Sequence, residues 1–458
     1  MEILQQEPIA ALATAPGIGA IAVIRVSGDH AIEITNRLFR GKDLSRQASH
    51  TVHFGTIRDA QNTIIDEVLV SLFRSPASFT KEDVVEISCH GSDYVIRQIL
   101  RLLLKEGVRM AQPGEFTQRA FLNGQFDLVQ AEAVADLIAA DSEATHRAAL
   151  TQLRGGFSKQ LKALRQQLIE FAALIELELD FGEEDVEFAQ RDDLRRLVWS
   201  IQRVLRPLIE SFAVGNAIKQ GVATVLAGKP NAGKSTLLNA LLNEEKAIVS
   251  DIPGTTRDVI EDELFIDGIR FRLIDTAGLR EATDTIEAIG VERTRQQLDK
   301  AAIIVYLFDV AEATPAEISA VEADLKQRSV PYVLVANKMD KLSAEKLNEW
   351  QRTFGENLVP IQANTGKNLT EMTQRLTGFV KANTVPGCTV VTNLRHYEHL
   401  TQTDAALARV LDGLDAGTTQ DWLAIDLRDA LRHLGELTGE ITTDDLLATI
   451  FSKFCIGK

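Results

Sequence analysis

The sequence contains little cysteine, no long apolar run and no excess of positive charge. Its three cysteines, Cys89, Cys388 and Cys455, are spread over 458 residues. This scarcity excludes a disulfide framework and a cysteine zinc site, and it is typical of a reducing compartment. No apolar segment approaches the length of a transmembrane helix, and the chain does not begin with the basic stretch of a signal peptide. We therefore expect a cytoplasmic protein with no membrane partner.

The charge balance limits the partners of the protein. The formal net charge is −16, with 45% hydrophobic and 25% charged residues, as in ordinary globular proteins. Binding of nucleic acid by bulk electrostatics requires clustered cations. Any RNA contact must therefore be local or shared with a partner. A length of 458 residues predicts about three domains.

Residues 228–235, Gly-Lys-Pro-Asn-Ala-Gly-Lys-Ser, match the phosphate-loop pattern G-x-x-x-x-G-K-[ST]. They follow the apolar run Val222–Ala227, which predicts the strand that this pattern requires. In that context backbone N–H groups surround the phosphates, Lys234 reaches the terminal phosphates, and the Ser235 hydroxyl is a ligand of Mg²⁺. The expected GTP contacts here are Asn231, Ala232, Gly233, Lys234, Ser235 and Thr236.

Two further segments are expected at the γ-phosphate. Thr256 is suited to be the second hydroxyl ligand of Mg²⁺ in a switch loop, whereas a simple turn at Pro253-Gly254 does not explain the threonines. Asp275 follows an apolar strand at residues 271–274, where an acid can hold a water of the metal. The predicted GTP contacts in the two segments are Ser250, Asp251, Ile252, Pro253, Gly254, Thr255, Thr256, Asp275, Thr276, Ala277 and Gly278.

The base is chosen by Asn337-Lys338-Met339-Asp340, which ends the second of two apolar strands predicted at residues 303–308 and 332–335. The Asp340 carboxylate can accept from both N1–H and N2–H of guanine, and adenine has no such pair. Hydrogen bonds to a charged group contribute about 1.5–3 kcal/mol each, so two favour GTP roughly a hundredfold. Lys338 is expected to pack on the base, Asn337 to tie this loop to the phosphate loop, and the Ala363 N–H to meet guanine O6.

Hydrolysis requires a group that orients water. Leu279 occupies the position where many signalling GTPases have a glutamine, and it cannot do so. Glu287, further along, is a candidate, although without further information a glutamate on a solvated helix surface is the better interpretation. No arginine finger, which contributes about 10³–10⁵ in rate, is evident in the chain. The Asn231 side chain, with carbonyls of residues 250–255, offers a cage for a monovalent cation instead.

The flanks predict the domain organisation. Leucines recur at helical spacing in residues 161–175 and again in residues 423–437, as on core-facing helices. We expect a helical domain interrupted by a G domain with a doubly wound, mainly parallel sheet, entered through a linker framed by Gly215 and Gly221. Runs at residues 21–26 and 84–87 predict a separate strand-rich α/β domain. The expected boundaries are 1–120 for the strand-rich domain, 121–215 with 385–458 for the helical domain, and 216–384 for the G domain.

The chain ends in Cys455-Ile456-Gly457-Lys458, which is not a prenylation signal because its last residue is lysine. Further features are spread over the whole chain together with this tetrapeptide and the inserted G domain. They are the early Ile24-Arg25-Val26-Ser27-Gly28 and the later Pro113-Gly114-Glu115-Phe116-Thr117 and Phe121-Leu122-Asn123-Gly124. Together they resemble the tRNA uridine-modification GTPase family known as MnmE or TrmE. The tetrapeptide combined with a G domain is highly specific for that family.

The resemblance implies a GTPase that works on tRNA with an FAD-dependent partner similar to MnmG (GidA), in a heterotetramer or larger complex. The resemblance implies that this GTPase and its partner add a carboxymethylaminomethyl-type group to C5 of the wobble uridine, position 34, of certain tRNAs. The one-carbon unit comes from a tetrahydrofolate derivative in its 5-formyl or 5,10-methylene form. The N-terminal domain is folate-binding-like and forms a homodimer, and the G domains meet in a potassium-dependent way during hydrolysis.

Carried over by position, the resemblance also implies site residues. Glu287 and Cys455 take catalytic roles, in hydrolysis and in one-carbon transfer. The folate contacts are Arg25, Glu86, Gln125 and Lys458, with Gln125 where the family has a basic residue. The potassium ligands are Asn231, Ser250, Ile252 and Thr255. Simpler interpretations exist for Arg25 as a surface cation, Glu86 as a strand-edge acid and Cys455 as a structural residue.

Two other classes of function share the G motifs. A ribosome-assembly GTPase is disfavoured because the sequence has no second G domain and no GXXG clamp of the KH type. A regulatory switch that binds effectors and supports no tRNA chemistry is the other alternative. Mass analysis of the wobble nucleosides in tRNA from a deletion strain separates the tRNA-modifying function from these alternatives.

Overall fold

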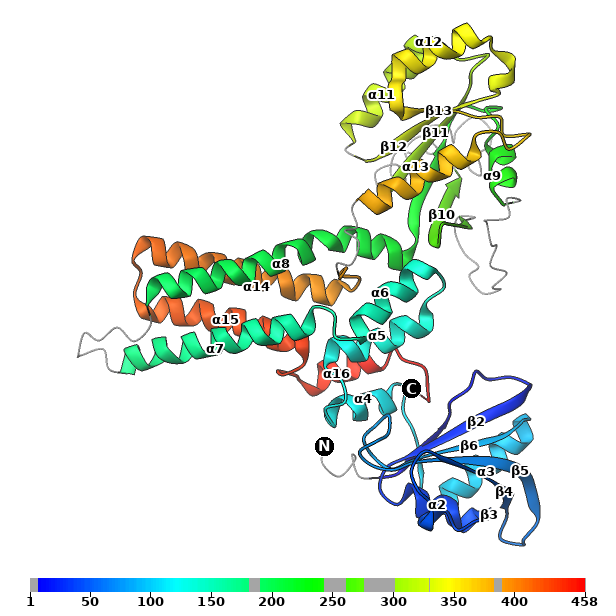
Figure 1. Ribbon diagram of the computed structural model, residues 1–458, viewed down its shortest axis with the longest axis vertical. Coiled ribbons are helices and arrows are strands. Elements are labelled where there is room, and N and C mark those ends of the chain that lie inside the picture. The colour runs from blue at the N-terminus through cyan, green and yellow to red at the C-terminus, as the bar shows by residue number, and fades with distance from the viewer. Residues whose placement is uncertain are drawn as a thin grey trace, which may run out of the picture. The chain divides into compact units, whose positions relative to one another are not determined.

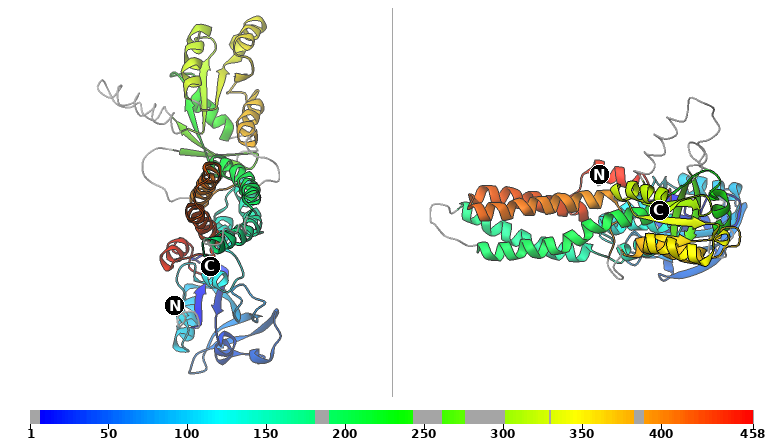
Figure 2. Two further views of the ribbon diagram at one scale, coloured as in Figure 1. Left: turned by 90° about the vertical axis from the view of Figure 1, so that its left-hand side faces the viewer. Right: turned by 90° about the horizontal axis from the view of Figure 1, so that it is seen from above.

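The computed structural model describes residues 7–180, 190–242, 261–275, 301–328, 330–382 and 389–457 (Figures 1 and 2). The chain divides into two compact units. The first consists of Met1–Ile138, Gln152–Leu197 and Ala406–Lys458, and the second of Ala139–Thr151 and Val198–Ala405. Helices α8 (Arg191–Gln220) and α14 (Leu394–Ala416) contribute residues to both units.

The first unit contains a seven-stranded sheet with the order β3-β4-β5-β6-β2-β1-β7 (Figure 1). Its strands are β1 (Ile9–Leu12), β2 (Gly19–Ser27), β3 (Phe39–Arg40), β4 (Thr51–Arg58), β5 (Ile64–Phe73), β6 (Val84–Gly91) and β7 (Arg109–Met110). Neighbours are antiparallel except β1 and β7, which are parallel. The strands predicted at residues 21–26 and 84–87 are confirmed as parts of β2 and β6.

The two faces of this sheet differ, because successive residues of a strand point to opposite sides. One face packs against helices α2 (Ala31–Leu38) and α3 (Asp93–Lys105) in a shared apolar core. The β2 residues in that core are Ala22, Ile24 and Val26. Arg25, which is out of phase with them, lies on the other face. On that face Phe54 is 65% exposed and Leu69 is 47% exposed.

The first unit continues with helices. They are the short 3₁₀ helix η1 (Leu44–Arg46), α4 (Glu115–Leu122), α5 (Leu128–Ala139), α7 (Ser158–Asp180), α15 (Gln420–Thr438) and α16 (Asp444–Phe451). Helices α7 and α15 pack side by side (Figure 1). Their buried residues follow the predicted helical spacing, among them Leu161, Leu168, Ile175, Leu423, Leu427 and Leu434. The predicted core-facing helices are therefore confirmed.

The second unit contains a six-stranded sheet with the order β13-β12-β11-β8-β10-β9. Its strands are β8 (Val222–Ala227), β9 (Glu261–Ile266), β10 (Ile269–Asp275), β11 (Ile303–Asp309), β12 (Tyr332–Asn337) and β13 (Leu358–Pro360). All neighbouring pairs are parallel except β9 with β10. This is the mainly parallel sheet expected of the G domain, and the four strands predicted from apolar runs coincide with β8, β10, β11 and β12.

Helices cover both faces of the second sheet. One core cluster contains residues of α9 (Lys234–Leu242), α13 (Leu369–Ala382) and the end of α8, and the other contains residues of α11 (Pro315–Gln327) and α12 (Ala344–Phe354). The short 3₁₀ helices η3 (Met339–Lys341) and η4 (Gly355–Asn357) and helix α6 (Glu143–Leu153) complete the described elements. The sheet is therefore doubly wound, as predicted.

The linker expected between Gly215 and Gly221 is wrong, because α8 continues through Gly215 to Gln220. Gly215 instead marks a close approach of two backbones: a Cβ there would lie 2.1 Å from the carbonyl oxygen of Val391. The glycine is required for packing and not for a turn. The domain boundaries at residues 120, 215 and 385 stay predictions. Within the described residues, no helix combines the length and apolarity that crossing a membrane requires.

Candidate functional site

The phosphate loop (residues 228–235) connects β8 to α9 in the second unit. Gly228 has φ +149° and Gly233 has φ +100°, in the region that favours glycine. A Cβ at Gly228 would lie 2.1 Å from the Leu307 carbonyl oxygen, and one at Gly233 would lie 2.4 Å from Asn337 Nδ2. Both glycines are therefore required, and neighbouring strands fix the course of the loop.

The start of α9 carries the predicted cation and hydroxyls. Lys234 is the first residue of the helix, and its Nζ donates to the carbonyls of Gly228 at 2.7 Å and Lys229 at 3.2 Å. Ser235 and Thr236 follow in the first turn and are exposed. The first N–H groups of a helix have no partner inside the helix and attract anions. This end of α9 is therefore suited to a phosphate with a bound cation.

Asn337, the last residue of β12, joins three loops. Its Nδ2 donates to the Ala232 carbonyl of the phosphate loop at 2.8 Å. Its Oδ1 accepts from the Lys338 N–H at 2.8 Å and from the Ala363 N–H at 3.1 Å. In this structure the N–H expected to meet guanine is thus bound to Asn337, and its contact with the base stays a prediction. Asp340 of η3 is exposed.

Lys338 bridges the base loop (residues 337–340) and the phosphate loop. Its Nζ donates to the Asn231 carbonyl at 3.0 Å and to Asp309 Oδ2 at 2.7 Å. Burial works against the charge of Asp309, but the hydrogen bonds from Lys338 and the Ala311 N–H hold the pKa of this carboxyl below its usual value. Sequence reasoning missed Asp309. The signal was an acid directly after the strand predicted at residues 303–308.

Several predicted residues lie outside the described part of the chain. They are Ser250, Asp251, Ile252, Pro253, Gly254, Thr255, Thr256, Thr276, Ala277, Gly278, Glu287 and Lys458. The backbone of Asp275 is described: it ends β10 and pairs with Leu226 of β8, two residues before the phosphate loop. Of the predicted potassium ligands, only Asn231 is described, and it is exposed with φ +62°.

A second candidate site lies on the face of the first sheet opposite to α2 and α3. Arg25 of β2 and Glu86 of β6 are direct cross-strand partners. Arg25 Nε donates to Glu86 Oε1 at 3.0 Å, and the Arg25 Nη1 donates to the Gly457 carbonyl at 3.4 Å. The guanidinium also lies 5.5 Å from the ring centre of Phe79 and 5.6 Å from that of Phe116. The structure therefore brings a predicted pair together with the end of the chain.

The terminal segment (residues 455–457) is seated by close backbone contacts. Gly457 has φ +98°, and a Cβ there would lie 2.2 Å from the Leu12 carbonyl oxygen. The Gly114 N–H donates to the Cys455 carbonyl at 3.4 Å. The Cys455 thiol is exposed and free. Cys89 in β6 is buried, and this burial together with the charge of Asp66 raises the pKa of its thiol to about 11.

Gln125 lies exposed in the turn after α4. That turn is tied to the loop that carries Phe79: Asn123 Nδ2 donates to the Thr80 carbonyl at 2.7 Å, and Lys81 Nζ donates to the Gly124 carbonyl at 2.8 Å. The turn of Gln125 and the ring that packs on Arg25 thus belong to one connected substructure. This connection supports grouping Gln125 with the pair on the sheet.

A buried ionic network connects β2, the loop that carries Phe79 and helix α4. It was not predicted from the sequence. Arg119 is 3% exposed and donates to Glu82 at 3.3 Å and to Glu115 at 3.1 Å. Ser27, two residues after Arg25, donates to Glu82 at 2.7 Å. Burial opposes ionisation of Glu115, but hydrogen bonds from Arg109 and the Gln112 N–H hold the pKa of Glu115 below its usual value.

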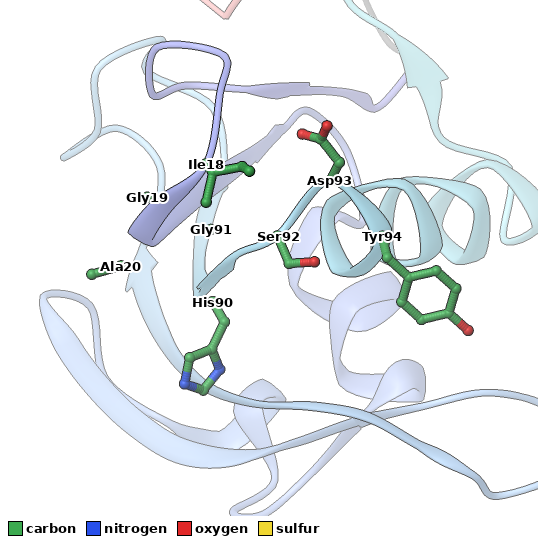
Figure 3. Close-up of a pocket in the computed structure, with 8 residues that line it drawn as sticks. All are labelled: Ile18, Gly19, Ala20, His90, Gly91, Ser92, Asp93 and Tyr94. Atoms are coloured by element: carbon green, nitrogen blue, oxygen red, sulfur yellow. The ribbon is translucent and has the colours of Figure 1, made fainter.

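A separate hollow of about 410 Å³ opens at the Gly19 end of β2, away from Arg25 (Figure 3). Its lining residues are Ile18, Gly19, Ala20, His90, Gly91, Ser92, Asp93 and Tyr94. His90 Nδ1 lies 2.8 Å from Asp66 Oδ1, and the His90 N–H donates to Asp66 Oδ2 at 2.8 Å. Arg25 lies near the Ser27 end of the same strand, so this hollow is distinct from the site on the sheet face.

Comparison with known proteins shows the family to which the chain belongs. The family model described as GTP-binding protein TrmE N-terminus matches residues 8–125, and the MnmE helical domain matches residues 128–455. The chain is 55% identical to the tRNA modification GTPase MnmE of Cytophaga hutchinsonii, over 99% of this chain and 98% of that protein. The chain belongs to the MnmE family. The predicted family resemblance is thereby confirmed.

A second MnmE relative, the tRNA modification GTPase MnmE of Bacteroides fragilis, is 52% identical over 99% of this chain and 100% of its own. Arg25 and Glu86 fall within the residue range of the N-terminal match, and residues 228–235 and Cys455 fall within the range of the other. Among solved structures, the G domain of the T. maritima FeoB iron transporter is 25% identical, covering 34% of this chain and 98% of that one, with a TM-score of 0.26.

Proposed function

We propose that this chain hydrolyses GTP and, with an FAD-dependent partner similar to MnmG, adds a carboxymethylaminomethyl-type group to C5 of the wobble uridine of certain tRNAs. A tetrahydrofolate derivative supplies the one-carbon unit. The observation that carries the tRNA-modifying part is the hydrogen bond from Arg25 to the Gly457 carbonyl, at 3.4 Å. It brings the segment that contains the exposed Cys455 to the pair expected to bind folate.

The chemistry of the second unit supports the GTPase part. Lys234 and the first turn of α9 are suited to the phosphates, with Ser235 and Thr256 as hydroxyl ligands of Mg²⁺. The Asp340 carboxylate selects guanine. Glu287 orients the attacking water, because Leu279 has no polar group with which to do so.

A potassium ion replaces the arginine finger in this proposal. Amide and carbonyl oxygens suit a monovalent cation, and the expected ligands are Asn231, Ser250, Ile252 and Thr255. Asn231 supports this role because it is exposed beside Lys234 in the phosphate loop, while its own carbonyl is held by Lys338. The side-chain amide oxygen of Asn231 is the group expected to bind the cation.

The first unit supports a folate site by its chemistry. Arg25 and Glu86 offer paired donors and acceptors for the polar edge of a flat heterocycle. The exposed Phe54 and Leu69 lie on the same face, in the cross-strand row next to that of the pair, and offer apolar surface for its ring. Folate carries the one-carbon unit when bound. The Cys455 thiol then assists its transfer towards the uridine, and Lys458 and Gln125 contribute polar contacts.

The assembly is part of the same proposal. The chain acts as a homodimer through its strand-rich domain, and it joins the FAD-dependent partner in a heterotetramer or larger complex that binds tRNA. The formal charge of −16 supports this division, because an acidic chain benefits from a partner that carries most of the phosphate contacts. The scarce cysteines support a cytoplasmic location.

Mass analysis of wobble nucleosides tests the proposal against the ribosome-assembly alternative. In tRNA from a strain that lacks this chain, C5-modified wobble uridine is expected to disappear and to return when the wild-type chain is supplied. A chain with Lys234→Ala, expressed at the same level, is the matched control and should fail to restore it. Unchanged nucleosides in the deletion strain, with altered ribosomal subunits, would favour a ribosome-assembly GTPase.

A further inference from the structure

Asp309 is a buried acid to which the proposed GTPase mechanism assigns no role. It is the last residue of β11 and the direct parallel neighbour of Asn337 on β12, and its side chain is 3% exposed. Oδ1 accepts from the Ala311 N–H at 2.9 Å, and Oδ2 accepts from Lys338 Nζ at 2.7 Å. Both carboxylate oxygens are therefore engaged, one by the backbone and one by the base loop.

The conformation of Lys338 requires support from its surroundings. Lys338 has φ +62°, in the left-handed region that non-glycine residues rarely adopt. Its ammonium group lies between Asp309 Oδ2 and the Asn231 carbonyl, which is 3.0 Å away. Lys338 thus links a buried carboxylate on β11 to the residue expected to hold potassium.

A negative charge is needed at this position because two cations meet there. Lys341 Nζ lies 3.9 Å from the same Asp309 oxygen that binds Lys338. Without the carboxylate charge, the two ammonium groups would repel each other, and nothing among the described residues would hold the half-buried Lys338 side chain against the phosphate loop except its bond to the Asn231 carbonyl. An uncharged amide of the same shape can keep the bond to Ala311 but cannot balance the two lysines.

We propose that Asp309 is a positioning residue: its carboxylate holds the Lys338 ammonium between the base loop and the Asn231 carbonyl, and thereby sets both nucleotide affinity and the response to potassium. Asp309 touches neither base nor phosphate in this assignment and acts through Lys338. The potassium part rests on the proposed function, in which Asn231 is a ligand of that ion.

The test uses the full chain with Asp309→Asn, which keeps the shape of the side chain and removes its charge. Dissociation constants for fluorescent GDP and a GTP analogue are expected to rise about tenfold, the scale of one charge-assisted hydrogen bond. The potassium concentration for half-maximal turnover should also rise, while kcat at saturating GTP and potassium stays near wild type. Glu312→Gln, the same charge change at an exposed residue nearby, is the matched control and should leave all three values unchanged.

Two readouts separate positioning from general damage. In a Lys338→Ala background, Asp309→Asn should cause no further loss, because its effect passes through the lysine. Inosine lacks the 2-amino group that Asp340 recognises, so the ratio of GTP to ITP affinity should stay at the wild-type value. A full additional loss without Lys338, or a changed ratio, would overturn the proposal.

Wild-type affinity and potassium response in Asp309→Asn would also overturn it. That result would leave the proposed GTPase function intact. The GTPase part of the proposed function fails if the wild-type chain neither binds nor hydrolyses GTP, which is measured in the same experiment before any variant is compared.

Discussion

In the second unit the candidate site lies at the carboxyl ends of parallel strands, whereas in the first unit it lies on the face of a mainly antiparallel sheet. The predicted nucleotide residues begin directly after β8 and at the last residues of β10 and β12. Arg25 and Glu86 are 61 positions apart, and Arg25 and Gly457 are 432 apart. Site residues at the ends of parallel strands come from short sequence motifs. Site residues on a sheet face are distant in sequence and are brought together only by the pairing register of the strands.

This difference predicts that the two sites can be disabled separately. The nucleotide site depends on charge and loop geometry at one sheet edge. The face site depends on an arginine, its cross-strand partner and the end of the chain. Changes at one site should alter its own chemistry and leave binding at the other unchanged, although the tRNA reaction requires both.

The largest expected effect concerns potassium at the nucleotide site. Replacing potassium by sodium at matched ionic strength should lower GTP turnover by up to about 10³, the lower end of what an arginine finger supplies. Folate affinity, measured by calorimetry in the two salts, should not change. Equal turnover in both salts would exclude the cation cage, and so would an Asn231→Lys chain that still responds to potassium.

The next effect concerns the water-orienting acid. Glu287→Ala should slow hydrolysis by roughly 10² or more, the scale of a lost general base or water-positioning group, while nucleotide affinity stays near wild type. Single-turnover kinetics and fluorescent-nucleotide binding measure the two quantities. Normal turnover in this variant would show that another group positions the water.

A smaller effect is expected at the sheet face. Arg25→Lys keeps the charge but loses the planar group that donates to Glu86 and lies near the rings of Phe79 and Phe116. Affinity for 5-formyltetrahydrofolate should fall about tenfold, because lysine cannot reproduce the planar, multiply bonded contact. GTP turnover in the same preparation serves as the control. Unchanged folate affinity would make Arg25 a structural cation.

Much of the second unit was predictable because its signals are local. Apolar runs indicated β8, β10, β11 and β12, and the residues that follow three of them formed recognisable motifs. Asp309 escaped because its role depends on which strand lies beside β11 and on where the Lys338 side chain turns. The spacing of residues within one strand does not indicate which side chain of a neighbouring parallel strand each of them will contact.

The first unit shows where sequence reasoning ends. The strands at residues 21–26 and 84–87 were expected from their β-branched runs, and family resemblance suggested Arg25 and Glu86. The resemblance grouped Lys458 with this pair and so implied that the end of the chain lies there, but the hydrogen bond from Arg25 to the Gly457 carbonyl was not predicted, because no local pattern relates residues 432 positions apart. Gly215 was assigned to a linker for a related reason: the backbone that crowds it, at Val391, is remote in sequence.

The most direct test of two separable sites on one chain is Cys455→Ser, assayed for both chemistries. We expect potassium-stimulated GTP turnover within about twofold of wild type, since Cys455 lies far along the chain from the phosphate loop, and loss of C5-modified wobble uridine in tRNA from cells that carry only this variant. Full modification with Cys455→Ser would contradict the account, because the thiol would then be only a structural part of the terminal segment.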